Sequence, residues 1–317
     1  MTKLIAKHHA LGTEIDLTVF REPDVHIFDA TFDLIDTFED LLTVNREHSE
    51  VMDINDAAGQ HAVSVSPTVY ELVKQAVLAS REERGFDVTI GPLVQLWHIG
   101  FKDARLPQAA EIQAKMQLMG ANEIVLDDDR RSVFLPRVGM QLDLGGIGKG
   151  YIADRVRDFW LQNGISSGII NLGGNLMFVG PSQHADTRWR VGIQVPFARR
   201  NDALGIASIT GGSVGTSGIY ERFLTVNGKQ YHHIIDPVTG YPVQTNLASV
   251  TVLSQNSTVG EIWSSWGFYN GVAKTLAMHP EEQEIGLIFT TQDKQIYLSP
   301  NLRGQFRVLD SEFTLHE

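Results

Sequence analysis

The chain has 317 residues, of which 43% are hydrophobic and 20% are charged, a composition typical of globular proteins and not of disordered ones. Lys and Arg total 26 against 38 Asp and Glu, which gives a formal net charge of −12. This charge argues against a nucleic-acid-binding protein, because such proteins present a basic face. The chain has no cysteine, which excludes disulfides and thiolate metal sites, so any metal must be held by oxygen or imidazole.

The N-terminal region contains only short apolar runs, which are interrupted by charged residues and histidines. A secretory signal needs an apolar run of ~7–15 residues, and a membrane-spanning helix needs a run of ~18 or more. Neither pattern is found in the sequence. We therefore expect a soluble, cytoplasmic protein without a membrane anchor.

In chain order, the first predicted elements are a strand and a set of helices. Polar and apolar residues alternate over Thr13–Phe20, as in a half-buried strand. Apolar residues then recur at helical spacing, and Pro67, which follows the capping residue Ser66, suits a first helical turn. Helices are expected over residues 29–44, 67–84 and 107–120, followed by a hairpin of residues 123–126 and 132–135.

The middle of the chain contains the most informative local pattern, a strand that leads through a glycine-rich turn into a helix. The strand is predicted over Met140–Leu144, the turn over Gly145–Gly150, and the helix ends at Gly164. Further strands are expected near residues 168–172, 189–194, 223–226, 231–235, 248–253, 285–290 and 295–298, with a helix over 260–279.

This order of elements predicts an α+β fold with mixed, largely antiparallel sheets and helices packed on them. No fixed repeat of 20–50 residues is visible, which argues against a solenoid or a propeller. No Pro- or Ser-rich linker divides the chain. We therefore treat residues 1–317 as a single domain, with room for two lobes.

The glycine-rich segment Asp143–Asp154 suggests a phosphate site. It would place backbone amides and Lys149 at a helix N-terminus, where the helix dipole favours an anion. The standard nucleotide fingerprints do not fit, since Tyr151 stands where the dinucleotide motif needs its third glycine. For this segment alone, a plain tight turn is as good an interpretation as a phosphate site. Two more predicted turns rich in glycine and small polar residues, Asn171–Asn175 and Gly215–Gly218, favour a ligand.

His233 lies near the end of a predicted strand, just before a break at Asp236-Pro237. An imidazole titrates near neutral pH and could remove a proton from a hydroxyl nucleophile. A structural histidine with satisfied hydrogen bonds is at least as good an interpretation of the sequence. Asp236, three residues on, falls on the opposite face of a regular strand, so it meets His233 only if the turn folds back.

Carboxylates at two other places are candidates for polar sites. Glu261 and Ser265 are four residues apart at the start of a predicted helix, so they share one face and offer oxygen ligands to a hard cation such as Mg²⁺. The alternative is that Glu261 only interacts with the helix dipole. Asp87 is interpreted as a turn-forming aspartate unless a polar ligand binds beside it.

Seven short motifs follow one another along nearly the whole chain. They are Leu11-Gly-Thr13, Ser49-Glu-Val-Met-Asp-Ile-Asn55, Gly85-Phe-Asp-Val-Thr-Ile-Gly-Pro-Leu93, Asp143-Leu-Gly-Gly-Ile-Gly-Lys-Gly150, Asn171-Leu-Gly-Gly-Asn175, Thr216-Ser-Gly218 and His232-His-Ile-Ile-Asp-Pro-Val-Thr-Gly-Tyr-Pro242. Together, and in this order, they resemble the FAD:protein FMN transferase family, also called ApbE. Any one of these motifs alone would be weak, whereas seven in order are specific.

The resemblance implies an ApbE-like fold, related to the T-fold, and a magnesium-dependent enzyme. Such an enzyme transfers FMN from FAD to a threonine or serine hydroxyl of a target flavoprotein and releases AMP. His233 would be the base, Lys149 a second catalytic residue, and the Mg²⁺ ligands would be the carbonyl of Gly146 with Glu261 and Ser265. The cofactor-binding residues that the resemblance implies are Leu11, Asn55, Gly85, Phe86, Asp87, Asp143, Lys149, Thr216, Ser217, His233 and Ile235.

The chain departs from the family pattern at two places. Leu11 stands where the family has Met, and Glu261 and Ser265 stand where its metal segment has Asp and Thr, which keeps the oxygen ligands but lengthens one arm. Two alternatives are an FAD pyrophosphatase, in which water replaces the acceptor hydroxyl, and a non-catalytic FAD-binding protein. For the transferase, we expect acceptors among cytoplasmic flavoproteins such as reductase subunits.

Overall fold

The computed structural model describes residues 3–20, 26–199, 202–279 and 284–316. The chain divides into two compact units. Unit 1 consists of residues 1–39, 149–218 and 246–317, and unit 2 consists of residues 40–148 and 219–245. Each unit therefore draws its parts from both halves of the sequence. The interpretation of residues 1–317 as one functional domain stays a prediction.

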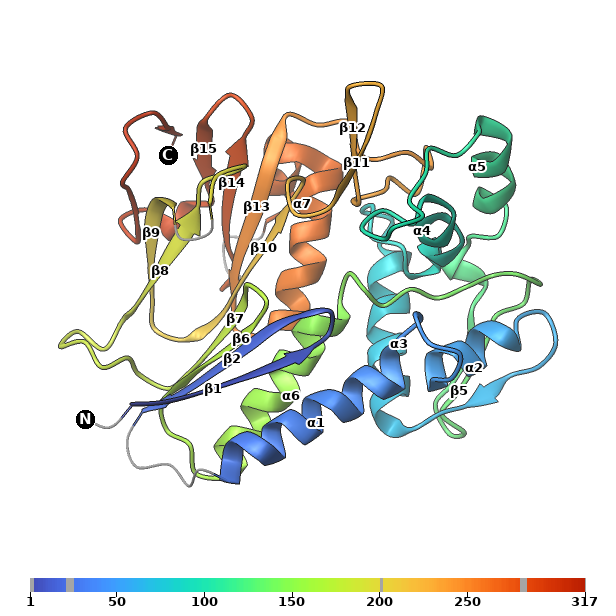
Figure 1. The fold of residues 1–317 in the computed structure, drawn as a ribbon, viewed down its shortest axis with the longest axis horizontal. Coiled ribbons are helices and arrows are strands. Elements are labelled where there is room, and N and C mark those ends of the chain that lie inside the picture. The colour runs from blue at the N-terminus through green and yellow to red at the C-terminus, as the bar shows by residue number, and fades with distance from the viewer. Residues whose placement is uncertain (1–2, 21–25, 200–201, 280–283, 317) are drawn as a thin grey trace. The chain divides into compact units, whose positions relative to one another are not determined.

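Unit 1 is built around a large sheet (Figure 1). Among the described residues, this sheet has nine strands in the order β1-β2-β6-β7-β10-β13-β14-β15-β17. All neighbouring strands pair antiparallel except β15 and β17, which pair parallel, so the predicted antiparallel character is confirmed. The strands are β1 (Lys3–Ala10), β2 (Thr13–Phe20), β6 (Gly168–Leu172), β7 (Asn175–Val179), β10 (Gly212–Gly218), β13 (Leu247–Ser254), β14 (Gly286–Thr291), β15 (Gln295–Leu298) and β17 (Thr314–His316).

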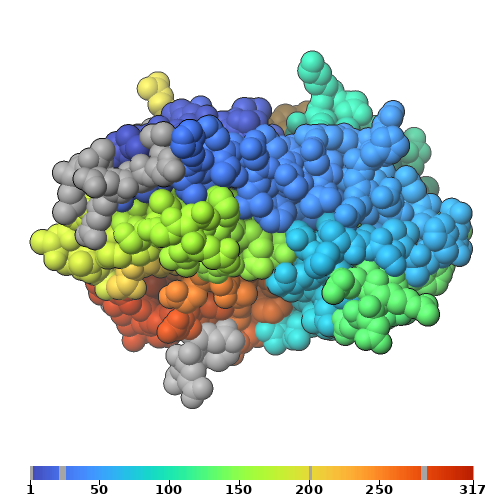
Figure 2. Space-filling model, turned by 90° about the horizontal axis from the view of Figure 1, so that it is seen from below, coloured from blue at the N-terminus to red at the C-terminus, as the bar shows by residue number. Residues whose placement is uncertain are grey.

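Helices α6 (Gly148–Gln162) and α7 (Ser257–Met278) belong to unit 1, as does most of α1 (His26–Leu42). Helix α7 packs on β10 and β13, where a Cβ at Gly267 would lie 2.9 Å from Val250 Cγ1. Helices α6 and α1 are joined by a 2.9 Å hydrogen bond that Trp160 Nε1 donates to Thr31 Oγ1. Figure 2 shows α1 in blue beside α6 in yellow-green on one face of the molecule. Phe38, one of the apolar residues that recur at helical spacing in α1, packs edge-on against Tyr151 of α6.

A second, smaller sheet in unit 1 forms a core against the large one. It contains β8 (Trp189–Gln194), β9 (Ala203–Ile209) and β16 (Phe306–Val308). The 3₁₀ turn Pro300–Leu302 adds Leu302 to the same core. Buried side chains of this sheet, among them Leu204, pack against Val214 of β10 and Ile288 of β14. The alternating burial along β8 accounts for the strand pattern of the sequence.

Unit 2 contains short helices, a small sheet and a hairpin. Its aromatic centre is Trp97, which is fully buried, packs with Leu93 and Ile112, and donates a 2.9 Å hydrogen bond from Nε1 to the carbonyl of Gly240. This bond ties the hairpin region to the helices. The elements are α2 (Glu50–Asp56), β3 (Val63–Ser64), α3 (Pro67–Arg81), α4 (Gly91–Trp97), α5 (Ala109–Met116), β4 (Val125–Asp127), β5 (Ser132–Phe134), β11 (Phe223–Val226), β12 (Lys229–His232) and the 3₁₀ turns Val88–Ile90 and Ala121–Glu123.

The strand predicted over Met140–Leu144 is wrong, because this segment is in no strand. Its backbone bonds to a side chain and to a 3₁₀ turn in place of a neighbouring strand. Leu142 exchanges two hydrogen bonds with the Asn55 amide, at 2.7 and 3.1 Å, and the Asp143 amide donates to the carbonyl of Val88 at 2.8 Å. Its burial alternates along the segment, which explains the sequence pattern, but it has no strand partner.

The turn predicted over Gly215–Gly218 is also wrong, since these residues form the end of β10. Cross-strand pairing with β13 holds the segment in register, with Thr216 opposite Thr251 and Gly218 opposite Ser249. Glycine has low strand propensity, and here pairing with β13 overrides it. The turn predicted within Asn171–Asn175 is confirmed, since Gly173 and Gly174 link β6 to β7 with positive φ.

Candidate active site

The Glu261 carboxylate is the best-connected polar group among the predicted site residues of unit 1. Glu261 lies in the second turn of α7, where Oε2 accepts a 2.7 Å hydrogen bond from the amide of Gly150 on α6. Oε1 accepts a 3.1 Å bond from Asn175 Nδ2 on β7. Burial raises the pKa of Glu261, while the positive charge of Lys149 and these two hydrogen bonds oppose that rise. Three elements therefore meet at one carboxylate.

A buried chain of hydrogen bonds continues from this carboxylate to the start of α7. Ser257 Oγ donates to Asn175 Oδ1 at 2.8 Å, and the Ser257 amide donates to Asp154 Oδ1 at 2.8 Å. Asp154 also accepts from the amide and the hydroxyl of Thr258, at 2.9 and 2.6 Å, so it satisfies the first amides of α7 from outside the helix. We call the connected groups of Glu261, Gly150, Asn175, Ser257 and Asp154 the Glu261 network.

The glycine-rich segment differs from the expected cradle of free amides. The amide of Gly145 donates to the Asp143 carboxylate at 2.7 Å, and the amides of Ile147 and Gly148 both donate to the carbonyl of Leu144. The amide of Gly150 donates to Glu261. Most backbone amides of this segment that were expected to bind a phosphate therefore donate to acceptors within the chain. Burial raises the pKa of Asp143, and the bond from Gly145 opposes this rise.

Three predicted cofactor residues lie at strand ends of unit 1. Leu11 adopts a left-handed conformation with φ 56° in the turn between β1 and β2, and its amide donates to Glu39. Thr216 shares a 2.8 Å hydrogen bond with Thr251. Ser217 donates to Ser264 at 2.8 Å, because Ser264 gives its own proton to the carbonyl of Glu261. Ser217 is therefore tied to the same turn of α7 as Glu261.

A second group of predicted residues comes together in unit 2. Asn55 is buried and holds Leu142 with both ends of its amide, so its side chain positions the segment that leads to Asp143. Phe86 is buried, and its ring lies beside Gly146. A Cβ added at Gly146 would be 3.4 Å from the Phe86 ring. These contacts bring the motifs around residues 55, 85–87 and 143–146 to one place in this unit.

Gly85 and Asp87 flank Phe86 and shape the turn. Gly85 has φ 103°, a conformation that favours glycine. Asp87 accepts bonds from the amide and the hydroxyl of Thr89, at 2.8 and 2.6 Å, and so caps the 3₁₀ turn that follows. Burial raises the pKa of Asp87, and the bonds from Thr89 oppose this rise. The interpretation of Asp87 as a turn-forming aspartate is confirmed.

The two adjacent histidines of unit 2 have different surroundings. His232 Nε2 donates to the carbonyl of Val243 at 3.0 Å, and His232 Nδ1 accepts from the amide of Ile234 at 3.3 Å. Burial lowers the pKa of His232, partly offset by the bond to Val243. Both nitrogens thus have backbone partners in the neutral ring, which is the signature of a structural histidine.

His233 bonds to a backbone carbonyl of the same hairpin. Its amide and its Nδ1 both donate to the carbonyl of Arg222, at 3.1 and 3.2 Å. Because a carbonyl only accepts, Nδ1 carries the proton, and in the neutral ring the lone pair is on Nε2. This is the tautomer that a general base requires.

Asp236 and Ile235 follow the histidines but do not share their surroundings. The Asp236 carboxylate accepts from the Val238 amide at 2.8 Å and from the Thr239 hydroxyl at 3.0 Å, so both oxygens serve the turn. Ile235 is buried in the core around Trp97. The side chain of Ile235 is therefore a packing residue, and Asp236 is a turn residue.

The predicted metal ligands are all oxygen donors. Among the described residues, no group of three or more His, Asp or Glu side chains is placed to hold a metal ion. Glu261 and Ser265, one turn apart on α7, offer one carboxylate and one hydroxyl, and the carbonyl of Gly146 is neutral. This donor set suits a hard cation such as Mg²⁺, which binds through one or two carboxylates plus substrate phosphates.

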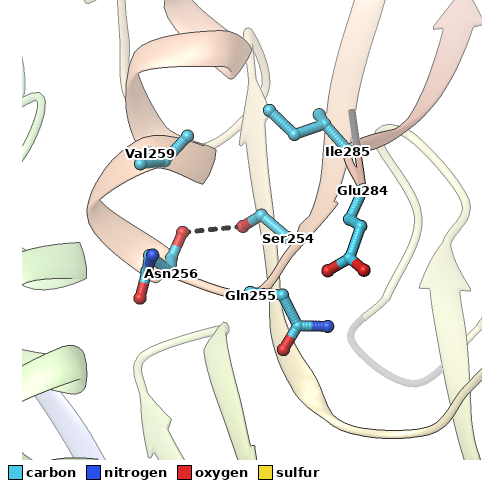
Figure 3. A pocket seen from close by; sticks show the side chains of 6 residues that line it. All are labelled: Ser254, Gln255, Asn256, Val259, Glu284 and Ile285. Atoms are coloured by element: carbon cyan, nitrogen blue, oxygen red, sulfur yellow. Dashed lines mark hydrogen bonds between the residues drawn. The ribbon is translucent and has the colours of Figure 1, made fainter. Parts of the chain in front are cut away.

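A surface cavity of about 170 Å³ lies near the start of α7 in unit 1 (Figure 3). Its lining residues are Ser254, Gln255, Asn256, Val259, Glu284 and Ile285. Ser254 Oγ donates to the carbonyl of Asn256 at 2.8 Å and closes the loop that enters the helix. None of the predicted site residues lines this cavity, so it is separate from the Glu261 network.

Residues 11–289 match the model of the ApbE family. The chain belongs to the ApbE family. It is 44% identical over 304 residues to an FAD:protein FMN transferase of Klebsiella pneumoniae, a match that covers 96% of this chain and 94% of the relative. It is 32% identical to the FAD:protein FMN transferase of Treponema pallidum, over 92% of this chain and 84% of that relative. The resemblance read from the seven motifs is confirmed.

The solved structures agree with this family membership. The crystal structure of the ApbE protein of Thermotoga maritima matches with a TM-score of 0.88 and 28% identity, over 96% of this chain and all of that chain. The apo flavinyl transferase ApbE of Pseudomonas stutzeri matches with a TM-score of 0.78 and 26% identity, over 92% of each chain. The predicted ApbE-like α+β fold is confirmed. Within the part of the chain that the structure describes, no helix combines the length and the apolar character needed to cross a bilayer.

Proposed function

We propose that this protein is an FAD:protein FMN transferase that uses FAD as donor, Mg²⁺ as cation, and a threonine or serine hydroxyl of a flavoprotein as acceptor. The observation that carries the proposal is the 44% identity to the Klebsiella pneumoniae transferase over 96% of this chain. The sequence of this chain contains the kinds of side chain that phosphoryl transfer requires, namely a candidate base, a lysine and a pair of oxygen ligands.

In the proposed reaction, His233 Nε2 takes the proton of the acceptor hydroxyl. The hydroxyl oxygen forms a bond to the phosphorus of the FMN half, the bond between that phosphorus and the bridging oxygen breaks, and AMP leaves with the bridging oxygen. The hydrogen bond from His233 Nδ1 to the Arg222 carbonyl supports this role, because it leaves the lone pair on Nε2. The alternative role of a structural histidine fits His232, whose two nitrogens both bond to backbone.

Lys149 and the proposed Mg²⁺ ligands would act on the diphosphate. Lys149, in the first turn of α6, supplies a cation, and Glu261 with Ser265 and the Gly146 carbonyl would hold Mg²⁺. Bound Mg²⁺ supplies positive charge that stabilises the phosphate oxygens while the P–O bond breaks. Residues Leu11, Asn55, Gly85, Phe86, Asp87, Asp143, Thr216, Ser217 and Ile235 remain proposed contributors to the FAD site, by side chain, by backbone or through the segments that they hold.

The test uses the full chain with FAD, Mg²⁺ and a panel of co-expressed flavoprotein acceptors. We expect an acceptor whose intact mass rises by one FMN, with AMP released in equal amount. AMP release that does not depend on an acceptor would support the pyrophosphatase instead. FAD binding without any AMP would support the non-catalytic alternative. A cytoplasmic location, and reductase subunits as acceptors, stay predictions.

A further inference from the structure

We propose that Asn175 is a positioning residue, which orients the Glu261 carboxylate toward the cation of the transfer reaction. The inference rests on the proposed function and adds to it a residue outside the predicted site. Asn175 stands at the first position of β7, directly after the Gly173-Gly174 turn. Its amide lies between Ser257 and Glu261 and touches both.

The orientation of the Asn175 amide is determined at both ends. Glu261 Oε1 accepts at 3.1 Å, so the group that faces it must be the NH₂ of Asn175. The oxygen of the same amide then faces Ser257, whose hydroxyl donates to it at 2.8 Å. A reversed amide would place oxygen against a carboxylate and NH₂ against a donor. The hydrogen bond to Glu261 is therefore specified by Ser257.

The surroundings hold this arrangement in place. Asn175 is 6% exposed and Ser257 is 1% exposed, so water does not compete freely for either group. Ser257 is itself tied to Asp154 through its amide. Asp154 and Gly150 are four residues apart on α6, which places both on the face that meets α7. The orientation of Asn175 is thus anchored to the same helix that supplies the second donor to Glu261.

Close packing of α6 on α7 limits the positions open to the carboxylate. A Cβ at Gly150 would lie 2.7 Å from both Glu261 Oε2 and the carbonyl oxygen of Ser257, so only glycine allows this approach. Each Glu261 oxygen accepts one bond within unit 1 and keeps a second lone pair for a cation. Groups that orient a metal-ligating carboxylate in this way affect metal affinity without touching the metal.

The decisive variant is Asn175→Asp, which keeps the shape of the side chain and its acceptor for Ser257 but replaces the donor to Glu261 with an oxygen. Mg²⁺ binding to the full chain is measured by isothermal titration with Mg²⁺ alone and again with FAD present. The Mg²⁺ dependence of AMP release is measured in parallel. We expect the apparent dissociation constant for Mg²⁺ to rise about tenfold or more. FAD binding without Mg²⁺ should change little.

The chain offers a matched control in the same turn. Asn171 Nδ2 donates to the Asp16 carboxylate at 3.4 Å, and Asn171 Oδ1 accepts from the Gly174 amide at 2.8 Å. Asn171→Asp therefore also places one carboxylate beside another, but away from Glu261. We expect this variant to lose less stability than Asn175→Asp, because Asp16 is partly exposed and pairs with Lys7. Its Mg²⁺ dissociation constant should stay within about twofold of the wild type.

Ser257→Ala gives a second test if Asn175→Asp does not fold. It removes only the hydroxyl that orients Asn175, so we expect a smaller rise in the Mg²⁺ dissociation constant, about two- to fivefold. Unchanged Mg²⁺ affinity in the folded variants would overturn the proposal, and so would an equal loss in Asn171→Asp. A wild-type chain that binds no Mg²⁺ would also overturn it. A wild type that binds Mg²⁺ but modifies no acceptor would instead contradict the proposed function.

Discussion

In unit 1 the Glu261 carboxylate is held by groups from two other elements, the Gly150 amide of α6 and the Asn175 side chain of β7. In unit 2 His233 is held by the carbonyl of Arg222, which lies across the β11–β12 hairpin. The first arrangement needs the Asn175 side chain and a glycine at position 150, which are distant from Glu261 in the sequence. In the second, the bonds to Arg222 need a backbone carbonyl and no particular side chain at position 222.

This difference predicts how each region responds to substitution. Changes to the neighbours of Glu261 should alter its position, because Asn175 and Ser257 act through their side chains. Changes to the Arg222 side chain should leave the bonds to His233 in place, because any residue at position 222 retains a carbonyl. In the hairpin, the large effect should come from the histidine itself.

The largest expected effect is therefore that of His233→Ala. Removal of a general base lowers the rate of FMN transfer about 10²- to 10⁴-fold, while FAD binding should stay close to that of the wild type. The measurement is the rate of AMP release and of acceptor mass gain. His61→Ala, a change at an exposed histidine of the same unit, serves as the control. A loss below about tenfold would show that another group takes the proton.

Asp154→Asn tests the side-chain-dependent region through its effect on stability. The Asp154 carboxylate accepts three hydrogen bonds from Ser257 and Thr258, and an amide reproduces these only in part. We expect a loss of about 2 kcal/mol in the free energy of unfolding, measured with urea. Asp158→Asn on the same helix, where Asp158 forms partly exposed ion pairs with Arg155 and Arg157, should cost less than about 1 kcal/mol. Equal losses would contradict the capping role of Asp154.

His232 gives a pH dependence to the hairpin region. Its folded-state pKa is lowered, chiefly by burial, so the unfolded chain binds a proton more readily than the folded one. This contribution to stability is present above the unfolded pKa of about 6.5 and is lost as the pH falls through the folded pKa. His232→Gln, which cannot titrate, should flatten the decline in urea midpoint between about pH 7.5 and pH 5. An unchanged slope would assign the decline to other groups.

The elements of this fold are predictable from the sequence where each obeys one local pattern. The strand β2, the helix α3 with its Ser66 cap and the hairpin β4–β5 follow from alternation, capping and turn residues. The segment Met140–Leu144 is wrongly predicted because its burial alternates as in a strand, while its backbone bonds to Asn55 and Val88 in place of a neighbouring strand. The end of β10 is missed because Gly215–Gly218 is held by pairing with β13, which local propensity does not describe.

The candidate site is predictable in its residues but not in its connections. The spacing of Glu261 and Ser265 places them on one face of α7, as predicted. The amide of Gly150 donates to the Glu261 carboxylate, and the two residues are 111 positions apart in the sequence. No local signal therefore shows that Glu261 accepts a hydrogen bond from an amide that was expected to bind a phosphate. Similarly, His232 and His233 are equivalent in the sequence. In the structure they differ in their bonds, since His232 bonds to the backbone of Val243 and Ile234 and His233 bonds to the carbonyl of Arg222. The role of His233 as a base stays a proposal.

The smallest expected effect concerns the turn of the hairpin that carries His233. Asn227 and Gly228 have φ 50° and 78°, the left-handed pair of a two-residue hairpin turn, and four residue pairs separate them from Arg222 and His233. Asn227→Ala should cost about 1 kcal/mol of stability, because alanine tolerates positive φ poorly, and Asn227→Gly should cost less. Since the cross-strand pairs keep the Arg222 carbonyl beside His233, the transfer rate of both folded variants should stay within about twofold of the wild type. A transfer rate that falls in proportion to the lost stability would mean that the hairpin opens. The hydrogen bonds from His233 to the Arg222 carbonyl would then position His233 less firmly than the Asn175 side chain positions Glu261.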